Sequence, residues 1–120
     1  MSRNVLIIED NPGIGDLVRM HVTDLGMTPV LCDRGDTGLA RFREGDIDLV
    51  ILDLMLPGLD GLSVCREIRS GSGYVPVLML TAKGQQQDRT TARQLGVDAV
   101  ITKPFSKREV LECVNNLANG

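Results

Sequence analysis

Polar residues that could bind a metal ion and a phosphoryl group follow the short apolar runs of this sequence. Such runs are typical of buried parallel strands. The polar residues at their carboxyl ends are Glu9, Asp10, Asp53, Thr81 and Lys103. Because an open parallel sheet binds its ligands outside the carboxyl ends of its strands, we expect these side chains to converge at one edge.

This set of side chains points to a divalent cation and to phosphoryl chemistry. Carboxylates this close repel one another unless a cation lies between them, and hard oxygen ligands suit Mg²⁺ (or Mn²⁺). One carboxylate could act as a nucleophile and form an aspartyl phosphate. Thr81 and Lys103 would then supply a hydroxyl donor and a positive charge to the phosphoryl oxygens. Each residue alone is more often structural, so the prediction depends on the whole set in this order.

The apolar runs alternate with helical patterns, which predicts an α/β doubly wound parallel sheet with right-handed crossovers and helices on both faces. Strands are expected at residues 4–9, 28–32, 48–53, 76–80 and 98–102, and helices at 12–25, 35–44, 60–70, 85–95 and 106–118. Asn11 before Pro12 suits the start of the first helix. Ser106 with Glu109 three residues later is typical of a capping box before the last helix.

The fourth predicted helix carries little apolar surface. Ala92 and Leu95 are its apolar residues between positions 85 and 95. Such a helix is either a weakly anchored element that moves or a well-solvated surface helix, and composition does not separate the two.

Length and composition indicate one globular domain, residues 1–120. The net charge of −3 gives no basic surface for nucleic acid. No apolar run approaches the roughly 20 residues that span a bilayer, and because the first residues lead directly into the first strand, we expect no signal peptide. The cysteines at positions 32, 65 and 113 are too widely spaced for a disulfide framework or a zinc site, so we expect buried thiols in a reducing cytoplasm.

Over essentially its full length the chain resembles the receiver domains of two-component response regulators, most of all those of the winged-helix-linked subfamily. The matching residues are Glu9-Asp10, Asp53 within LDLMLPGLDG, Thr81-Ala82 and Lys103-Pro104-Phe105. The resemblance implies the flavodoxin-like fold, with five strands in the order 2-1-3-4-5.

The resemblance also implies the roles of the acidic residues. Asp53 would accept a phosphoryl group from the phosphohistidine of a sensor histidine kinase or a phosphotransfer protein. Asp10, Asp53 and the backbone carbonyl of Met55 would ligate Mg²⁺, and Glu9 would act through a metal-bound water. A receiver of this kind is not an enzyme for other substrates, because it catalyses only its own phosphorylation and dephosphorylation.

On the phosphate side, the resemblance implies that Thr81 and Lys103 contact the phosphoryl oxygens and that the small Ala82 leaves the approach to the site open. The family usually has a cis peptide bond before Pro104. Phosphorylation would pull Thr81 and the following loop inward and remodel the face formed by the fourth helix, the fifth strand and the fifth helix. Val100 stands where the family usually has an aromatic or histidine switch residue, and a valine cannot swing as a ring does.

A homodimer through that same face is a further expectation. In the subfamily, dimers form through charge pairs, and Arg89 and Glu109 match one such pair. The second pair is absent, because this chain has Ala99 and Cys113 at those positions.

Other functions fit the sequence less well. A degenerate receiver that acts as a phosphorylation-independent interaction module is the main alternative, and the intact acidic set argues against it. The first strand leads into Glu-Asp-Asn-Pro-Gly rather than a glycine-rich loop, which disfavours nucleotide binding. His21 lies beside an apolar helical stripe and is expected to be a packing residue rather than a phosphohistidine. Whether an output domain accompanies the receiver stays open.

Overall fold

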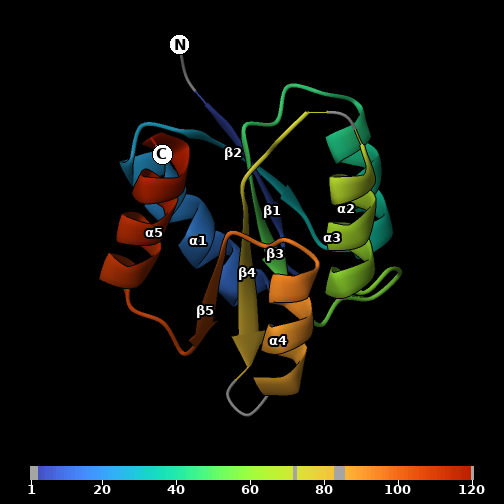
Figure 1. Ribbon diagram of the computed structural model, residues 1–120. Helices are drawn as coiled ribbons and strands as arrows, with labels where there is room; N and C mark the ends of the chain where they lie inside the picture. Colours follow the sequence, from blue (N-terminus) through green and yellow to red (C-terminus); the bar gives the residue numbers. More distant parts are fainter. Residues whose placement is uncertain (1–2, 72, 83–85, 120) are drawn as a thin grey trace.

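The protein is a parallel five-stranded sheet between two layers of helices (Figure 1). The computed structural model describes residues 3–71, 73–82 and 86–119, and in α4 it describes the side chains from residue 90 onward. The strands are β1 (Asn4–Ile8), β2 (Thr28–Cys32), β3 (Leu49–Asp53), β4 (Val77–Ala82) and β5 (Ala99–Lys103). The helices are α1 (Pro12–Asp24), α2 (Gly35–Arg43), α3 (Gly61–Ser70), α4 (Gln86–Gln94) and α5 (Lys107–Asn119). The strand order β2-β1-β3-β4-β5 confirms the predicted topology.

Strand alternation divides the core between the two faces of the sheet. Successive residues of a strand point to opposite faces, so Leu6 and Ile8 pack in one cluster while Val5 and Ile7 pack in the other. The first cluster meets α2, α3 and α4, and the second meets α1 and α5, as the two helical layers of Figure 1 show. All residues of β3 are buried, because this central strand is covered on both faces.

The helices begin where their capping residues predict. Asn11 Oδ1 accepts a hydrogen bond from Ile14 N at 3.1 Å, and Pro12 follows as the first residue of α1. Ser106 and Glu109 form the predicted capping box, with Glu109 N donating to Ser106 Oγ and Ser106 N donating to Glu109 Oε1, both at 3.1 Å. These caps determine where the chain turns from the carboxyl ends of β1 and β5 into α1 and α5.

Two strands extend beyond their predicted ends. β4 continues through Thr81 and Ala82, and β5 through Lys103, because the ladder pairs Thr81 with Thr102 and Ala82 with Lys103. Thr81 and Lys103 therefore belong to the sheet rather than to the loops that follow it. A site residue on a paired strand is held more firmly than one on a loop.

Some packing predictions need adjustment. His21 is a buried packing residue, as expected, with 5% of its surface exposed. Cys65 is buried, whereas Cys32 and Cys113 lie half-buried at the edges of the core. In the described part of α4, Ala92 is fully buried and belongs to the core cluster that also includes residues of α2 and α3. No helix among the described residues is long and apolar enough to cross a membrane.

Candidate functional site

The acidic residues converge at the carboxyl edge of the sheet. Glu9 and Asp10 follow β1, and Asp53 ends β3, the neighbouring strand. One carboxylate oxygen from each residue lies within 4.8 Å of those of the other two. Glu9 and Asp53 are buried and Asp10 is exposed. The parallel register brings together residues that are more than forty positions apart in the sequence.

Lys103 reaches into this cluster from β5. Its Nζ lies 2.9 Å from Glu9 Oε1 and donates a hydrogen bond to Asp53 Oδ2 at 3.1 Å. Only 21% of the Lys103 side chain is exposed, so these ion pairs are largely shielded from solvent. A single ammonium cannot balance three carboxylates, so the edge keeps an excess of negative charge that suits a divalent cation.

Burial changes the proton affinity of this cluster. It acts together with the hydrogen bond to Asp53 to raise the pKa of Glu9 from 4.5 to about 7, against the opposing effect of Lys103. Burial also disfavours the charged form of Lys103, but its contacts with Glu9 and Asp53 outweigh that cost and raise the pKa of the ammonium. Lys103 therefore stays positively charged at neutral pH.

Glu9 should make the stability of the metal-free protein depend on pH. Its pKa is higher in the folded state than the 4.5 of an exposed glutamate, so its contribution is fully present below about pH 4.5 and is lost as pH rises through about 7. In EDTA, the unfolding free energy of the wild type should fall relative to that of Glu9→Gln across this window, by roughly 3 kcal/mol at most. Urea unfolding of both proteins at several pH values measures this difference.

The comparison with Glu9→Gln isolates the carboxyl group. Burial also lowers the pKa of His21, but His21 is present in both proteins and its contribution cancels in the difference. A difference that stays constant from pH 4.5 to 7 would contradict the assignment to Glu9.

Backbone donors position the two buried carboxylates. Asn11 N donates to Glu9 Oε2 at 3.2 Å, and Met55 N donates to Asp53 Oδ1 at 3.3 Å. Sequence reasoning did not assign these donors, because a backbone N–H leaves no signal in residue type. The turn that follows Asp53 thus brings the backbone of Met55 to the site, while the Met55 side chain is 64% exposed.

Thr81 offers a buried hydroxyl. It is fully buried at the end of β4, and among the described residues its Oγ1 has no hydrogen-bond partner. A buried polar atom without a partner costs about 1–3 kcal/mol, so such an atom is expected where a ligand supplies the missing partner. A phosphoryl oxygen at the acidic edge would be such a partner.

The remaining predicted residues surround the site. Ala82 is exposed at the end of β4, and the peptide bond between Lys103 and Pro104 is cis. Val100 is half-buried and packs against the core cluster of α2, α3 and α4. The side chain of Arg89, which was matched to a dimer contact, lies outside the described residues, and the Glu109 carboxylate is engaged in the capping box.

An open cavity of about 460 Å³ lies at the acidic edge of the sheet and connects its carboxylates with solvent. Its lining consists of Glu9, Asp10, Asn11, Pro12, Ile14, Asp53, Met55, Ala82 and Lys103. Carboxylate-bearing residues and Lys103, placed at the carboxyl ends of β1, β3 and β5, thus line one space. The arrangement can hold a hard cation beside a nucleophilic carboxylate, with an ammonium ready for a transferred anionic group.

The chain matches known proteins in both sequence and structure. It is 42% identical over 113 residues to the transcriptional regulatory protein BaeR of Escherichia coli O6:H1, and 40% identical over 107 residues to the transcriptional regulatory protein ResD of Bacillus subtilis. These matches cover 94% and 89% of this chain but 47% and 44% of the relatives. The chain therefore spans slightly less than half the length of either relative.

Solved structures share the architecture. A putative response regulator from Chloroflexus aurantiacus superposes with a TM-score of 0.94 over 100% of both chains at 24% identity, a likeness of fold alone. The receiver domain of the sensor histidine kinase PA1611 from Pseudomonas aeruginosa has a TM-score of 0.91 over 100% of both chains at 29% identity, and its structure has a magnesium ion coordinated in the active site cleft.

The sequence model of one protein family, the response regulator receiver domain, matches residues 5–115 of this chain. That span runs from β1 into α5 and includes every residue of the acidic edge. Since that match takes in nearly the whole chain, this protein belongs to the receiver domain family of two-component response regulators.

Proposed function

We propose that Asp53 is the phosphoacceptor of this receiver and that it takes its phosphoryl group from the phosphohistidine of a sensor histidine kinase or a phosphotransfer protein. The observation that carries this proposal is the position of Asp53, whose buried carboxylate ends β3, contacts Lys103 and lies near the carboxylates of Glu9 and Asp10. Apart from Glu9, Asp10 and Asp53, the described residues contain no group of three or more carboxylate, histidine or cysteine side chains that comes together in this way.

Asp53, Lys103 and Thr81 have different roles in the phosphoryl transfer. An Asp53 oxygen attacks phosphorus, a new O–P bond forms, and the bond from phosphorus to the donor nitrogen breaks. Lys103 balances the negative charge on the phosphoryl oxygens, and the Thr81 hydroxyl can donate to one of them. The receiver then catalyses its own phosphorylation and dephosphorylation and acts on no other substrate.

The acidic edge fits a resident Mg²⁺ ion, or Mn²⁺ in its place. Its donors are hard carboxylate oxygens, the ligands that these cations prefer. Asp10, Asp53 and the carbonyl of Met55 would hold the ion, with Glu9 acting through water. When bound, the ion supplies positive charge that offsets the repulsion between the carboxylates and the incoming phosphate.

Removal of one proposed ligand should weaken metal binding and stabilise the metal-free protein. Asp10→Asn should lower the affinity for Mg²⁺ by at least about tenfold, because a charged oxygen ligand is lost. In EDTA the same variant should unfold at a higher temperature than the wild type, since like-charge repulsion is relieved. Mg²⁺ titration by calorimetry and thermal melts measure the two effects.

Asp16→Asn is the matched control for Asp10→Asn, because Asp16 is exposed on α1 and outside the cluster. Asp16→Asn should keep the wild-type affinity for Mg²⁺. In EDTA it should not show the higher unfolding temperature that is expected of Asp10→Asn. An unchanged affinity in Asp10→Asn would place the metal elsewhere.

The output follows from the position of the site. A phosphoryl group adds about −1.5 to −2 charge at neutral pH and would attract the Thr81 hydroxyl at the end of β4, from which the chain leads to α4. The face of α4, β5 and α5 would change as a result, and a homodimer through that face is one way to use the change. Val100 stands at the position of the usual aromatic or histidine switch residue, so the change in this face would occur without the rotation of an aromatic side chain.

The names of the relatives support a role in transcription. BaeR and ResD are transcriptional regulatory proteins about twice the length of the aligned region, which supports a cytoplasmic regulator whose output part lies outside this domain. The receiver itself, with a net charge of −3, would not contact nucleic acid directly.

Phosphorylation by a small donor tests the proposal. Incubation with acetyl phosphate and Mg²⁺ should add a single phosphate, about 80 Da, to the intact mass. The adduct should be labile to hydroxylamine, as acyl phosphates are, and EDTA should prevent its formation. A folded, Mg²⁺-binding protein that gives no adduct with this donor or with a phosphorylated histidine kinase would instead be a phosphorylation-independent interaction module.

A further inference from the structure

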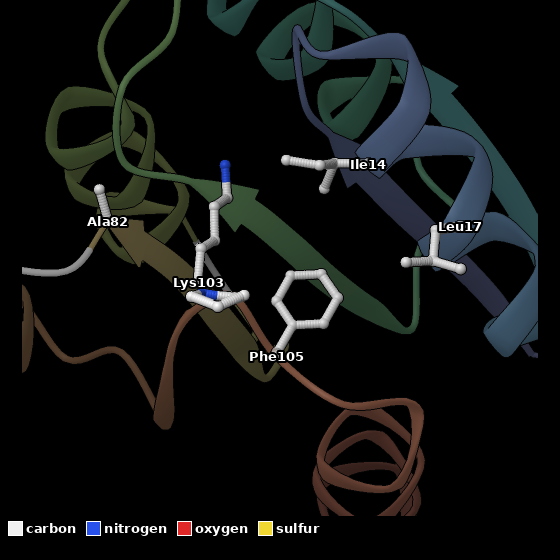
Figure 2. A pocket seen from close by; sticks show the side chains of 6 residues that line it. Ile14, Leu17, Ala82, Lys103 and Phe105 are labelled. Carbon is white, nitrogen blue, oxygen red and sulfur yellow. The ribbon is translucent and has the colours of Figure 1, made fainter.

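An apolar pocket adjoins the phosphoacceptor cavity between α1 and the segment that joins β5 to α5. Its volume is about 320 Å³, and its lining is Ile14, Leu17, Ala82, Lys103, Pro104 and Phe105. Figure 2 shows Ile14 and Leu17 on α1, on one side of the Phe105 ring, and Lys103 and Ala82 on the other. This volume is at the lower end of the range of pockets that bind small molecules.

The pocket and the phosphoacceptor cavity share a wall. Ile14, Ala82 and Lys103 line both. Of the described residues around the apolar pocket, Lys103 is the one that carries a charge, and its ammonium contacts Asp53 in the neighbouring cavity. Because the two spaces share this wall, a small molecule whose apolar body fills the apolar pocket would place an attached phosphoryl head in the phosphoacceptor cavity, where Lys103 and a bound cation supply positive charge.

We propose that this pocket receives the apolar part of a small phosphodonor, so that the protein favours aromatic acyl phosphates over acetyl phosphate. The inference rests on the proposed function, because it places the phosphoryl group of the donor beside Lys103 and Asp53 in the phosphoacceptor cavity. An aromatic ring would bury apolar surface against Phe105 and Leu17 that the methyl group of acetyl phosphate cannot cover.

The transfer is balanced without another reactant. An Asp53 carboxylate oxygen forms a bond to phosphorus, and the bond between phosphorus and the acyl oxygen breaks. The electron pair of that bond leaves with the aromatic carboxylate, so no proton has to be delivered. Only the binding of the leaving group differs between the aromatic donor and acetyl phosphate.

The test compares benzoyl phosphate with acetyl phosphate in the presence of Mg²⁺. The readout is the ratio of the two second-order rate constants for adduct formation, which cancels changes common to both donors. Leu17→Gln places a polar side chain of similar length in the pocket wall and should lower this ratio about tenfold. The rate with acetyl phosphate should stay at the wild-type value.

Met20→Gln is the matched control. Met20 is an exposed apolar residue of the same helix, 57% exposed against 41% for Leu17, and it does not line the pocket. It should keep the wild-type ratio. Equal ratios in the wild type and Leu17→Gln, or the same decrease in Met20→Gln, would overturn the proposal and leave an apolar segment of a protein partner as the occupant.

Binding without transfer separates this inference from the proposed function. Phenylphosphonate has the aromatic body and the anionic head but cannot donate its phosphorus group, and methylphosphonate lacks the ring. Phenylphosphonate should shift the NMR resonances of the Leu17 methyls and the Phe105 ring, and methylphosphonate should not. Absence of that shift would refute the pocket assignment, whereas a shift without an adduct from either donor would refute phosphate acceptance by Asp53 alone.

Discussion

Asp53→Asn should abolish the phosphate adduct and leave the fold intact. The amide has nearly the shape of the carboxylate and can still accept the hydrogen bond that Met55 N donates to Oδ1. It lacks the negative charge and the nucleophilic oxygen that attack on phosphorus requires. The intact mass after incubation with acetyl phosphate and Mg²⁺ should therefore gain about 80 Da in the wild type and nothing in the variant.

The control for this experiment lies in the same loop. Asp60 follows β3 by seven positions and caps α3, where its Oδ1 accepts a hydrogen bond from Ser63 N at 2.9 Å. Asparagine is an equally good helix cap, so Asp60→Asn should fold and take up phosphate like the wild type. An adduct of normal yield in Asp53→Asn would disprove the assignment of the phosphoacceptor.

The variant should also be at least as stable as the wild type without metal. The Asp53 carboxylate lies beside that of Glu9, and its replacement removes a like charge from a buried site. It also removes one of the two ion pairs of Lys103, which opposes that gain. A cooperative melt near the wild-type temperature would show that the missing adduct reflects lost chemistry rather than a lost fold.

The layers of the fold could be predicted from the sequence because burial leaves a strong pattern. The continuous apolar run of β3 is fully buried, as its composition indicates, and alternation between strand and helix requires parallel pairing. The strand order could not come from that alternation, because several orders satisfy it. It came from the resemblance to a family.

The same limit applies to the site. That Glu9, Asp53 and Lys103 would meet followed from their places at the ends of strands. The sequence could not show that the Lys103 ammonium contacts both Glu9 and Asp53, because the conformation of a side chain leaves no periodic pattern in a sequence. Nor could the sequence show that the Thr81 hydroxyl is buried without a hydrogen-bond partner among the described residues, since this depends on how side chains pack in three dimensions.

Gly61→Ala should destabilise the protein and displace the phosphoacceptor loop. Gly61 is the buried first residue of α3, and its N–H donates to the Leu54 carbonyl at 2.9 Å. A Cβ at this position would overlap the backbone carbonyl of Asp53 and lie 2.8 Å from Leu54 Cα. Because both obstacles are backbone atoms, they cannot move aside as a flexible side chain would, and we expect a loss of about 3 kcal/mol in urea unfolding.

Gly13→Ala provides the contrast for that result. Gly13 lies in the first turn of α1, where the nearest contact of a new Cβ would be Asn11 Oδ1 at an ordinary 3.4 Å. Alanine is the better helix former, so this variant should be unchanged or more stable by up to about 1 kcal/mol. Equal stabilities for the two variants would show that α3 can shift away from β3 at little cost.

If Gly61→Ala instead loses stability, its folded fraction should also take up phosphate more slowly, because the carbonyl that the new methyl displaces belongs to Asp53 itself.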